Sequence, residues 1–88
     1  MVDPEEFADK EVARVYIAGR PGEAQRVERA LSDNGVDYMI DIEPFATRLL
    51  GGLPVEYQGV AFYVLSGQAV FSRRVLREAG LHAGLVEE

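Results

Sequence analysis

The 88-residue chain contains no cysteine and no tryptophan, and its one histidine is His82. The absence of cysteine excludes disulfides, thiolate metal sites and a cysteine nucleophile. A lone histidine can act as a general base or metal ligand, but a surface or structural role is more frequent. Asp37, Asp41 and Glu43 offer a weak set of oxygen ligands, whose simpler role is to solvate a strand edge. We therefore expect no bound metal, no cofactor and no enzymatic function; an enzyme acting through His82 and nearby carboxylates is the least favoured alternative.

Basic residues are few, with nine lysines and arginines against fifteen acidic residues, so the formal net charge at pH 7 is -6. A surface of this charge repels the phosphates of nucleic acids and the head groups of anionic lipids. Apolar runs long enough to span a bilayer are also absent, and the acidic segment MVDPEEFADK lacks the apolar core of a signal peptide. We expect a cytoplasmic protein that binds neither nucleic acid nor membranes.

The first half of the chain reads as a strand, a helix and a second strand. Residues 12–18 alternate and are rich in β-branched and aromatic side chains, which predicts a strand. Pro21 suits the first turn of a helix, and Gly35 ends that helix. Strict alternation over residues 36–42 predicts the second strand. Residues 1–11 precede this unit and are expected to form an acidic tail or a short helix.

The second half repeats this pattern. Residues 59–65 are apolar on both faces, as in a central strand; Ser66 can cap a helix that Gly80 ends, and residues 81–86 make a short final strand. The repeat predicts a single α+β domain over residues 12–88 with the ferredoxin-like order βαββαβ. In that fold, right-handed crossovers place two helices on one face of a four-stranded antiparallel sheet.

The predicted sheet has one face without helices. Alternation places under the helices Val15, Ile17, Tyr38, Ile40, Phe62 and Val64, and on the open face Arg14, Tyr16, Met39, Ala61, Tyr63 and Leu65. An exposed apolar face of this kind is typical of an interface. We therefore predict a homo-oligomer, either a dimer or a trimer, with an interface that contains Tyr16, Met39, Tyr63 and Leu65. The alternative is that the N-terminal segment or a long loop folds over this face.

That long loop is expected at residues 43–58, EPFATRLLGGLPVEYQ, because prolines and a glycine pair interrupt any regular element there. The segment is unusually apolar for a loop, and long loops in small domains often carry function. We predict that it contacts a protein partner through Phe45, Leu49, Leu50, Leu53 and Tyr57.

Both predicted helices begin after a turn in which an anion could bind. The residues concerned are Arg20 and Gly22 at the first helix, and Ser66 and Gly67 at the second. Neither turn matches a dinucleotide fingerprint or a P-loop, and Pro21 removes one N–H donor. A sensor of small molecules or anions, acting through these turns and the loop, is the alternative function. The one cluster of basic residues is expected to form a solvated helix face and comprises Arg73, Arg74 and Arg77.

The strand RVYIA is followed by the turn Arg20-Pro21-Gly22-Glu23-Ala24, the helix end Gly35-Val36 and, further on, Gly51-Gly52-Leu53-Pro54. These motifs resemble a family of small prokaryotic signal-transducing proteins, a domain of unknown function. The resemblance covers residues 12–79 and implies a ferredoxin-like fold arranged like that of the PII-type regulators. Those regulators are trimers that bind effectors between subunits and present a long loop after the second strand. This chain lacks their nucleotide-binding signatures, so the identity of an effector does not carry over, and the family has no assigned catalytic residues to transfer. A non-enzymatic regulatory or adaptor domain is the leading hypothesis.

Overall fold

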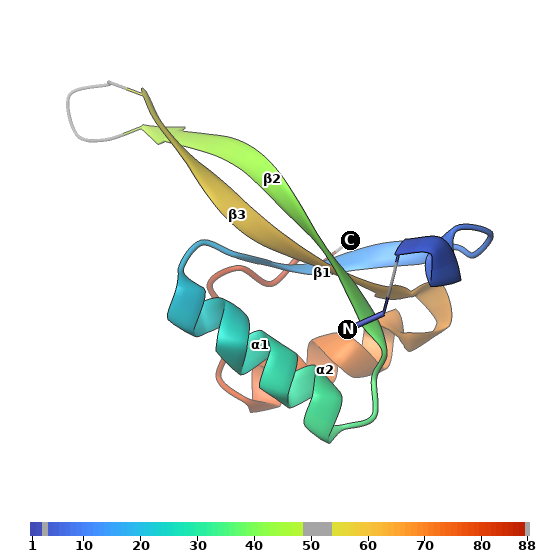
Figure 1. Cartoon of the computed structure of the whole chain (residues 1–88). Coiled ribbons are helices and arrows are strands. Elements are labelled where there is room, and N and C mark those ends of the chain that lie inside the picture. The colour runs from blue at the N-terminus through green and yellow to red at the C-terminus, as the bar shows by residue number, and fades with distance from the viewer. Residues whose placement is uncertain (3, 49–53, 88) are drawn as a thin grey trace.

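The computed structural model describes residues 1–2, 4–48 and 54–87. It is an α+β structure in which two helices lie on one face of a three-stranded antiparallel sheet with the order β1-β3-β2 (Figure 1). The elements are the short 3-10 helix η1 (Pro4–Phe7), β1 (Val12–Ala18), α1 (Pro21–Asp33), β2 (Tyr38–Arg48), β3 (Pro54–Leu65), the 3-10 turn η2 (Ser66–Gln68) and α2 (Ala69–Glu78). The α+β class and the two helices on one face are confirmed, whereas the sheet has three strands in place of the predicted four.

Both helices end in the way that their glycines predict. Gly35 has a φ of 71° and Gly80 a φ of 79°, a left-handed conformation that costs glycine little. After each glycine, a backbone N–H donates to a carbonyl five residues earlier: Val36 to Leu31 at 2.9 Å, and Leu81 to Leu76 at 2.9 Å. This is the Schellman arrangement, and its apolar partners are buried at both helix ends.

A bulge in β1 changes which side chains face the helices. Arg14 pairs with Tyr63 and Tyr16 pairs with Phe62, so Val15 is an extra residue in the strand. The extra residue reverses the alternation, because side chains along a strand point to opposite faces in turn. Tyr16 is therefore fully buried under the helices, and Ile17, paired with Ala61, lies on the open face. The predicted places of Tyr16 in the interface and Ile17 in the core were both wrong.

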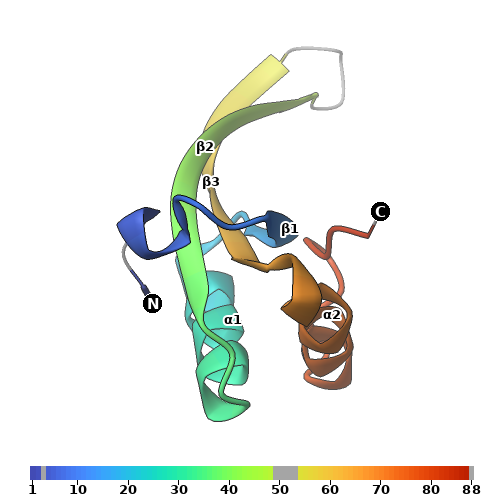
Figure 2. The same ribbon diagram turned by 90° about the vertical axis from the view of Figure 1, so that its right-hand side faces the viewer.

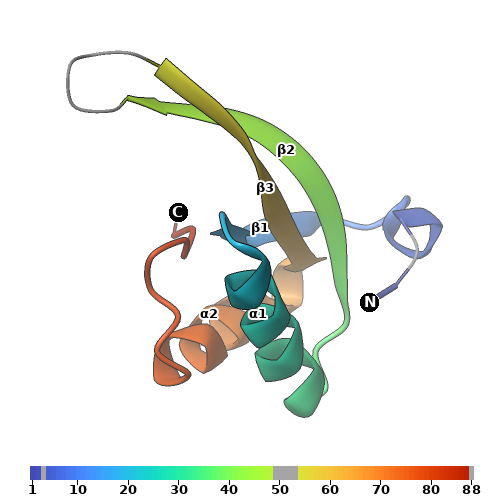
Figure 3. The same cartoon turned by 60° about the vertical axis from the view of Figure 1, so that its left-hand side comes forward.

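The predicted loop at residues 43–58 is largely a β-hairpin. β2 continues to Arg48 and β3 begins at Pro54, with a regular register from Glu43 opposite Gly59 to Arg48 opposite Pro54. The loop prediction was therefore wrong for residues 43–48 and 54–58. Leu49, Leu50 and Leu53 lie outside the described residues. Because β1 pairs with β3 no further than Val60, residues 43–48 and 54–59 form a two-stranded arm that projects from the body (Figure 3).

The two ends of the chain lie along the two edges of the sheet. The Val2 N–H donates to the Tyr38 carbonyl on the outer edge of β2, at 2.8 Å. On the outer edge of β1, Leu85 forms a single antiparallel bridge with Tyr16. The Ile17 N–H donates to Gly84, and the Val86 N–H donates to Val15, both at 2.9 Å. The predicted final strand is thus reduced to one bridge and two flanking hydrogen bonds.

The core lies between the helices and the sheet. Its fully buried side chains include Val15, Tyr16, Val27, Leu31, Phe62, Val64 and Leu76. The rings of Tyr38 and Phe62 stack at a tilt, with centroids 5.7 Å apart. On α2 the buried positions are Ala69, Ser72, Val75 and Leu76, whereas Phe71 is exposed.

Candidate functional site

The first candidate surface is the open face of the sheet together with the arm. The register places on the side away from the helices Val12, Arg14, Ile17, Met39, Asp41, Ala61, Tyr63 and Leu65. Of the predicted interface residues, Met39, Tyr63 and Leu65 are half-buried on this face, whereas Tyr16 is not on it. Ala61 is fully buried although it faces away from the helices.

The same face continues along the arm. By the pairing of β2 with β3, the face that carries Met39 and Tyr63 continues through the positions of Glu43 opposite Gly59, Phe45 opposite Tyr57 and Thr47 opposite Val55. Figure 2 shows the arm leaving the sheet on the side away from both helices. On its other face the helical cover has already ended at the base of the arm, where Ile42 is 50% exposed.

The predicted anion-binding residues do not form one site. Arg20 and Gly22 follow the last residue of β1, whereas Ser66 and Gly67 follow the last residue of β3. Since β1 and β3 are antiparallel, the two turns lie at opposite ends of this strand pair. The Ser66 N–H, for example, donates to the carbonyl of Glu11 just before β1 begins. A site that uses all four residues is therefore excluded.

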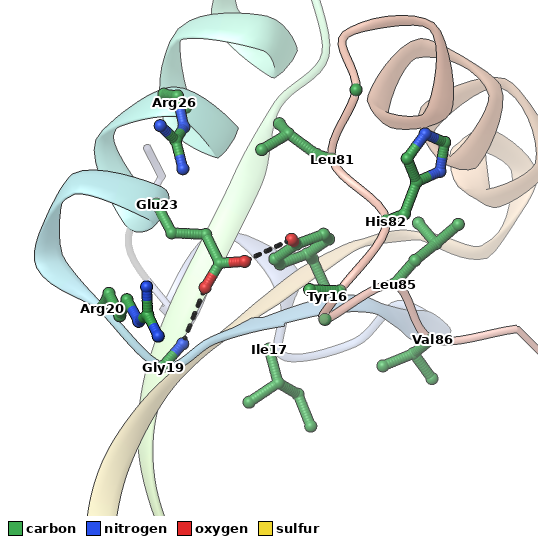
Figure 4. Close-up of a pocket in the computed structure, with 13 residues that line it drawn as sticks. Tyr16, Ile17, Gly19, Arg20, Glu23, Arg26, Leu81, His82, Leu85 and Val86 are labelled. Carbon is green, nitrogen blue, oxygen red and sulfur yellow. Dashed lines mark hydrogen bonds between the residues drawn. The ribbon is translucent and has the colours of Figure 1, made fainter.

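The second candidate is a hollow of about 920 Å3 between the start of α1 and the C-terminal segment 80–86 (Figure 4). Tyr16 lies at its floor, and its hydroxyl donates to Oε2 of Glu23 at 2.6 Å. The other carboxylate oxygen of Glu23 accepts the N–H of Gly19 at 3.1 Å. Both oxygens of Glu23 are thus engaged within the protein.

Besides Glu23, the ionisable side chains around the hollow are Arg20 and Arg26 on the α1 side and His82 on the opposite wall. All three are exposed. Within the described part of the chain, neither arginine takes part in an ion pair or a side-chain hydrogen bond. No local signal in the sequence indicates that Arg26 lines the same hollow as Tyr16 and His82.

Burial and hydrogen bonding perturb two tyrosines that touch α1. Burial, and then the hydrogen bond to Glu23, raise the pKa of Tyr16 above its ordinary value. Tyr38 donates to Oε1 of Glu28 at 3.0 Å, and its pKa is raised in the same way, first by burial and then by this bond. In both cases an ionised hydroxyl would face a carboxylate, so the neutral form is favoured.

The basic cluster on α2 binds the C-terminal segment. Nε of Arg73 donates to the carbonyl of Val86 at 2.7 Å, and Nη2 donates to that of Arg14 at 3.3 Å. Arg77 pairs with Glu87. The guanidinium of Arg74 lies over the ring of Phe71, 5.7 Å from its centroid. The expected solvated face was wrong for Arg73, which is half-buried and joins α2, β1 and the C-terminal segment.

Within residues 1–2, 4–48 and 54–87, no group of three or more His, Cys, Asp or Glu side chains is arranged to hold a metal ion. No helix in this part of the chain has the length and apolarity needed to cross a membrane. Comparison of the chain with models of protein families, with curated proteins and with solved structures finds no match. The resemblance to the signal-transducing family therefore stays a prediction.

Proposed function

We propose that the chain is a non-enzymatic protein-interaction domain of the regulatory or adaptor kind, which binds a second copy of itself through the open face and the arm. The observation that carries the proposal is the arm itself. It extends the open face beyond the body of the domain, and the described residues place no third strand or helix against it.

A two-stranded hairpin such as the arm is stabilised when another surface packs against it. Isolated hairpins are marginally stable in water, because two strands alone bury little apolar surface. Each strand of the arm also has an outer edge with no partner strand among the described residues, and such an edge can pair with another chain. The register assigns Phe45, Val55 and Tyr57 to one face. Contact with a partner along that face would bury apolar surface and restrain the ribbon.

We favour a second copy of the chain as the partner, because the same face on two copies has matching dimensions. With about 3.3 Å per residue and about 4.8 Å between strands, one face of the arm measures about 200 Å2 and the open face of the three-stranded body about 300 Å2. Two copies face to face would bury at most about 1,000 Å2 in total, the lower limit of a specific interface, because part of the face, such as Ala61, is already buried within one chain. A two-fold axis relates the same patch on both copies, so a single surface, which also includes the positions of Asp41 and Glu43, serves both sides.

The net charge of -6 on each copy opposes this association at low ionic strength. Salt screens that repulsion and affects apolar contacts far less. Self-association of this protein should therefore strengthen as sodium chloride is added, whereas association driven by ion pairs would weaken.

The test is sedimentation velocity over a concentration series. The wild-type chain should sediment faster as concentration rises, whereas Met39→Asp combined with Val55→Asp should stay monomeric. Val70→Asp is the matched control, because Val70 is 76% exposed on α2, away from the open face. A wild-type chain that is monomeric throughout, or equal effects of all the substitutions, would contradict the proposal. A trimer would preserve the interface proposal and replace the two-fold arrangement.

A ferredoxin-like fold is part of the same proposal. The C-terminal segment lies antiparallel to β1, where a fourth strand would complete the βαββαβ order, and the bridge between Tyr16 and Leu85 supports this placement. The signalling role rests on the sequence resemblance alone. If the wild-type chain is monomeric yet captures another protein through Phe45 and Tyr57, the arm is an adaptor surface for a different partner.

A further inference from the structure

We propose that the hollow beside α1 binds a small organic anion, with its carboxylate or phosphate group held by Arg20 and Arg26. This inference does not depend on self-association, since the hollow is built within one chain, between α1 and the C-terminal segment.

The hollow has the dimensions of a ligand site. Its volume of about 920 Å3 lies within the range of roughly 300–1,000 Å3 that is usual for small-molecule pockets. Apolar side chains from Leu81 and Leu85 and the ring of Tyr16 form part of its lining. Ala83 and Gly84 contribute little bulk, so backbone lines much of the far wall. Such a lining suits an anion with a short apolar portion.

The charge of the lining differs in sign from that of the chain. Arg20, Arg26 and Glu23 sum to +1, with His82 neutral, against -6 for the whole chain. The carboxylate of Glu23 is turned toward Tyr16 and Gly19, which satisfy its oxygens. The two arginines have no such partner in the described part of the chain, and Figure 4 shows them flanking Glu23 on one side of the hollow.

Arginine is the side chain best suited to this role. Its planar guanidinium donates two parallel hydrogen bonds to a carboxylate or phosphate, and it remains charged at all physiological pH values. His82 lines the opposite wall of the hollow, and Figure 4 shows its ring turned away from the two arginines. A mono- or dicarboxylate and a phosphate monoester share this recognition chemistry.

The experiment is an amide NMR titration of the full chain with succinate, benzoate and inorganic phosphate, each at matched ionic strength. At least one probe should shift the amides of residues 19–26 and 80–86 together. Succinate without phosphate identifies a carboxylate ligand, and phosphate alone identifies a phosphate ligand. Succinamide, which has the same shape without charge, should shift neither segment.

Arg20→Gln and Arg26→Gln should each weaken binding by about tenfold or more, since each removes a charge-assisted hydrogen bond. Arg29→Gln is the matched control, because Arg29 is exposed on α1 and does not line the hollow. Both test sites are exposed, and thermal melts will confirm that the variants fold. The proposal is overturned if no anion shifts both segments, if succinamide binds as well as succinate, or if Arg29→Gln weakens binding equally.

Discussion

The hydroxyl of Tyr16 donates a 2.6 Å hydrogen bond to the carboxylate of Glu23, seven residues later in the chain. Tyr16 is fully buried, and Glu23 lies in the first turn of α1. The second oxygen of Glu23 accepts the Gly19 N–H, so one carboxylate joins β1, the turn and α1. The bond links β1 to α1 and lies at the floor of the hollow.

Loss of this bond should be measurable as a loss of stability. Tyr16→Phe removes the hydroxyl and leaves Glu23 with one protein partner, so we expect the free energy of unfolding to fall by about 1–2 kcal/mol. Urea denaturation followed by circular dichroism will measure it. Tyr38→Phe is the comparison, because its bond to Glu28 is longer, 3.0 Å, and its effect should be the smaller one. Equal stability of Tyr16→Phe and wild type would show that the bond contributes nothing.

Both tyrosines should make stability depend on pH in the alkaline range. Their folded-state pKa values lie above the ordinary value of 10.0, so the folded protein holds these protons more tightly than the unfolded chain. The resulting contribution to stability is complete below about pH 10 and is lost as pH rises through the folded-state pKa values.

Thermal melts between neutral pH and strongly alkaline pH will test this, together with the absorbance of tyrosinate. In the variant Tyr16→Phe combined with Tyr38→Phe, the alkaline loss of stability should be smaller than in the wild type. An unchanged pH profile in that variant would assign the loss to other groups.

Gly84 is expected to tolerate no side chain. A Cβ at this position would lie 2.0 Å from the carbonyl oxygen of Ile17 and 2.7 Å from the Tyr16 ring, and backbone cannot yield as a side-chain tip does. Gly84→Ala should therefore detach the C-terminal segment from β1 and destabilise the fold by about 2 kcal/mol or more.

Gly22→Ala is the matched control for Gly84→Ala. Gly22 is in α1, and a methyl group added there would meet no other atom within 4 Å. Alanine at this position should therefore stabilise the protein by about 0.5–1 kcal/mol. Chemical denaturation of both variants gives the comparison. A harmless Gly84→Ala would show that the C-terminal segment is not held closely against β1.

Ser72 is the position where a polar-to-apolar substitution should help. Its side chain is fully buried in α2, and its Oγ has no hydrogen-bond partner in the described part of the chain. Ser72→Ala removes an unsatisfied hydroxyl and improves helix propensity, so we expect a gain of about 0.5–2 kcal/mol. Ser66→Ala, at an exposed position, should change stability much less. Destabilisation by Ser72→Ala would reveal a hydrogen bond to this hydroxyl, through water or a partner.

Local chemistry made parts of the fold predictable from the sequence. Gly35 and Gly80 ended helices as expected, because the left-handed conformation after a helix is a property of glycine itself. The two helices and the α+β class followed from short-range periodicity in the same way. Met39 and Tyr63 lie on the predicted face of the sheet, because side chains alternate without a break along β2 and β3 from the arm to the body.

The errors arose where a distant partner decides the structure. The bulge at Val15 is a mismatch between β1 and β3, and the sequence of β1 alone carries no sign of it. The arm was missed because Pro44 and Pro54 read as breakers, although an edge strand tolerates proline. The hollow forms because the C-terminal segment packs onto β1 and brings distant residues together. The sequence of either segment alone does not indicate this packing.

The positions of the two chain ends have a consequence for how copies of this protein meet. Val2 bonds to the outer edge of β2 at Tyr38, and residues 84–86 bond to the outer edge of β1 at residues 15–17, so each terminal segment occupies part of one border of the sheet. At these positions a strand of another molecule cannot add without displacing a terminal segment. Lateral growth into fibres is thereby hindered at the body, and removal of either terminus should make the protein prone to aggregate.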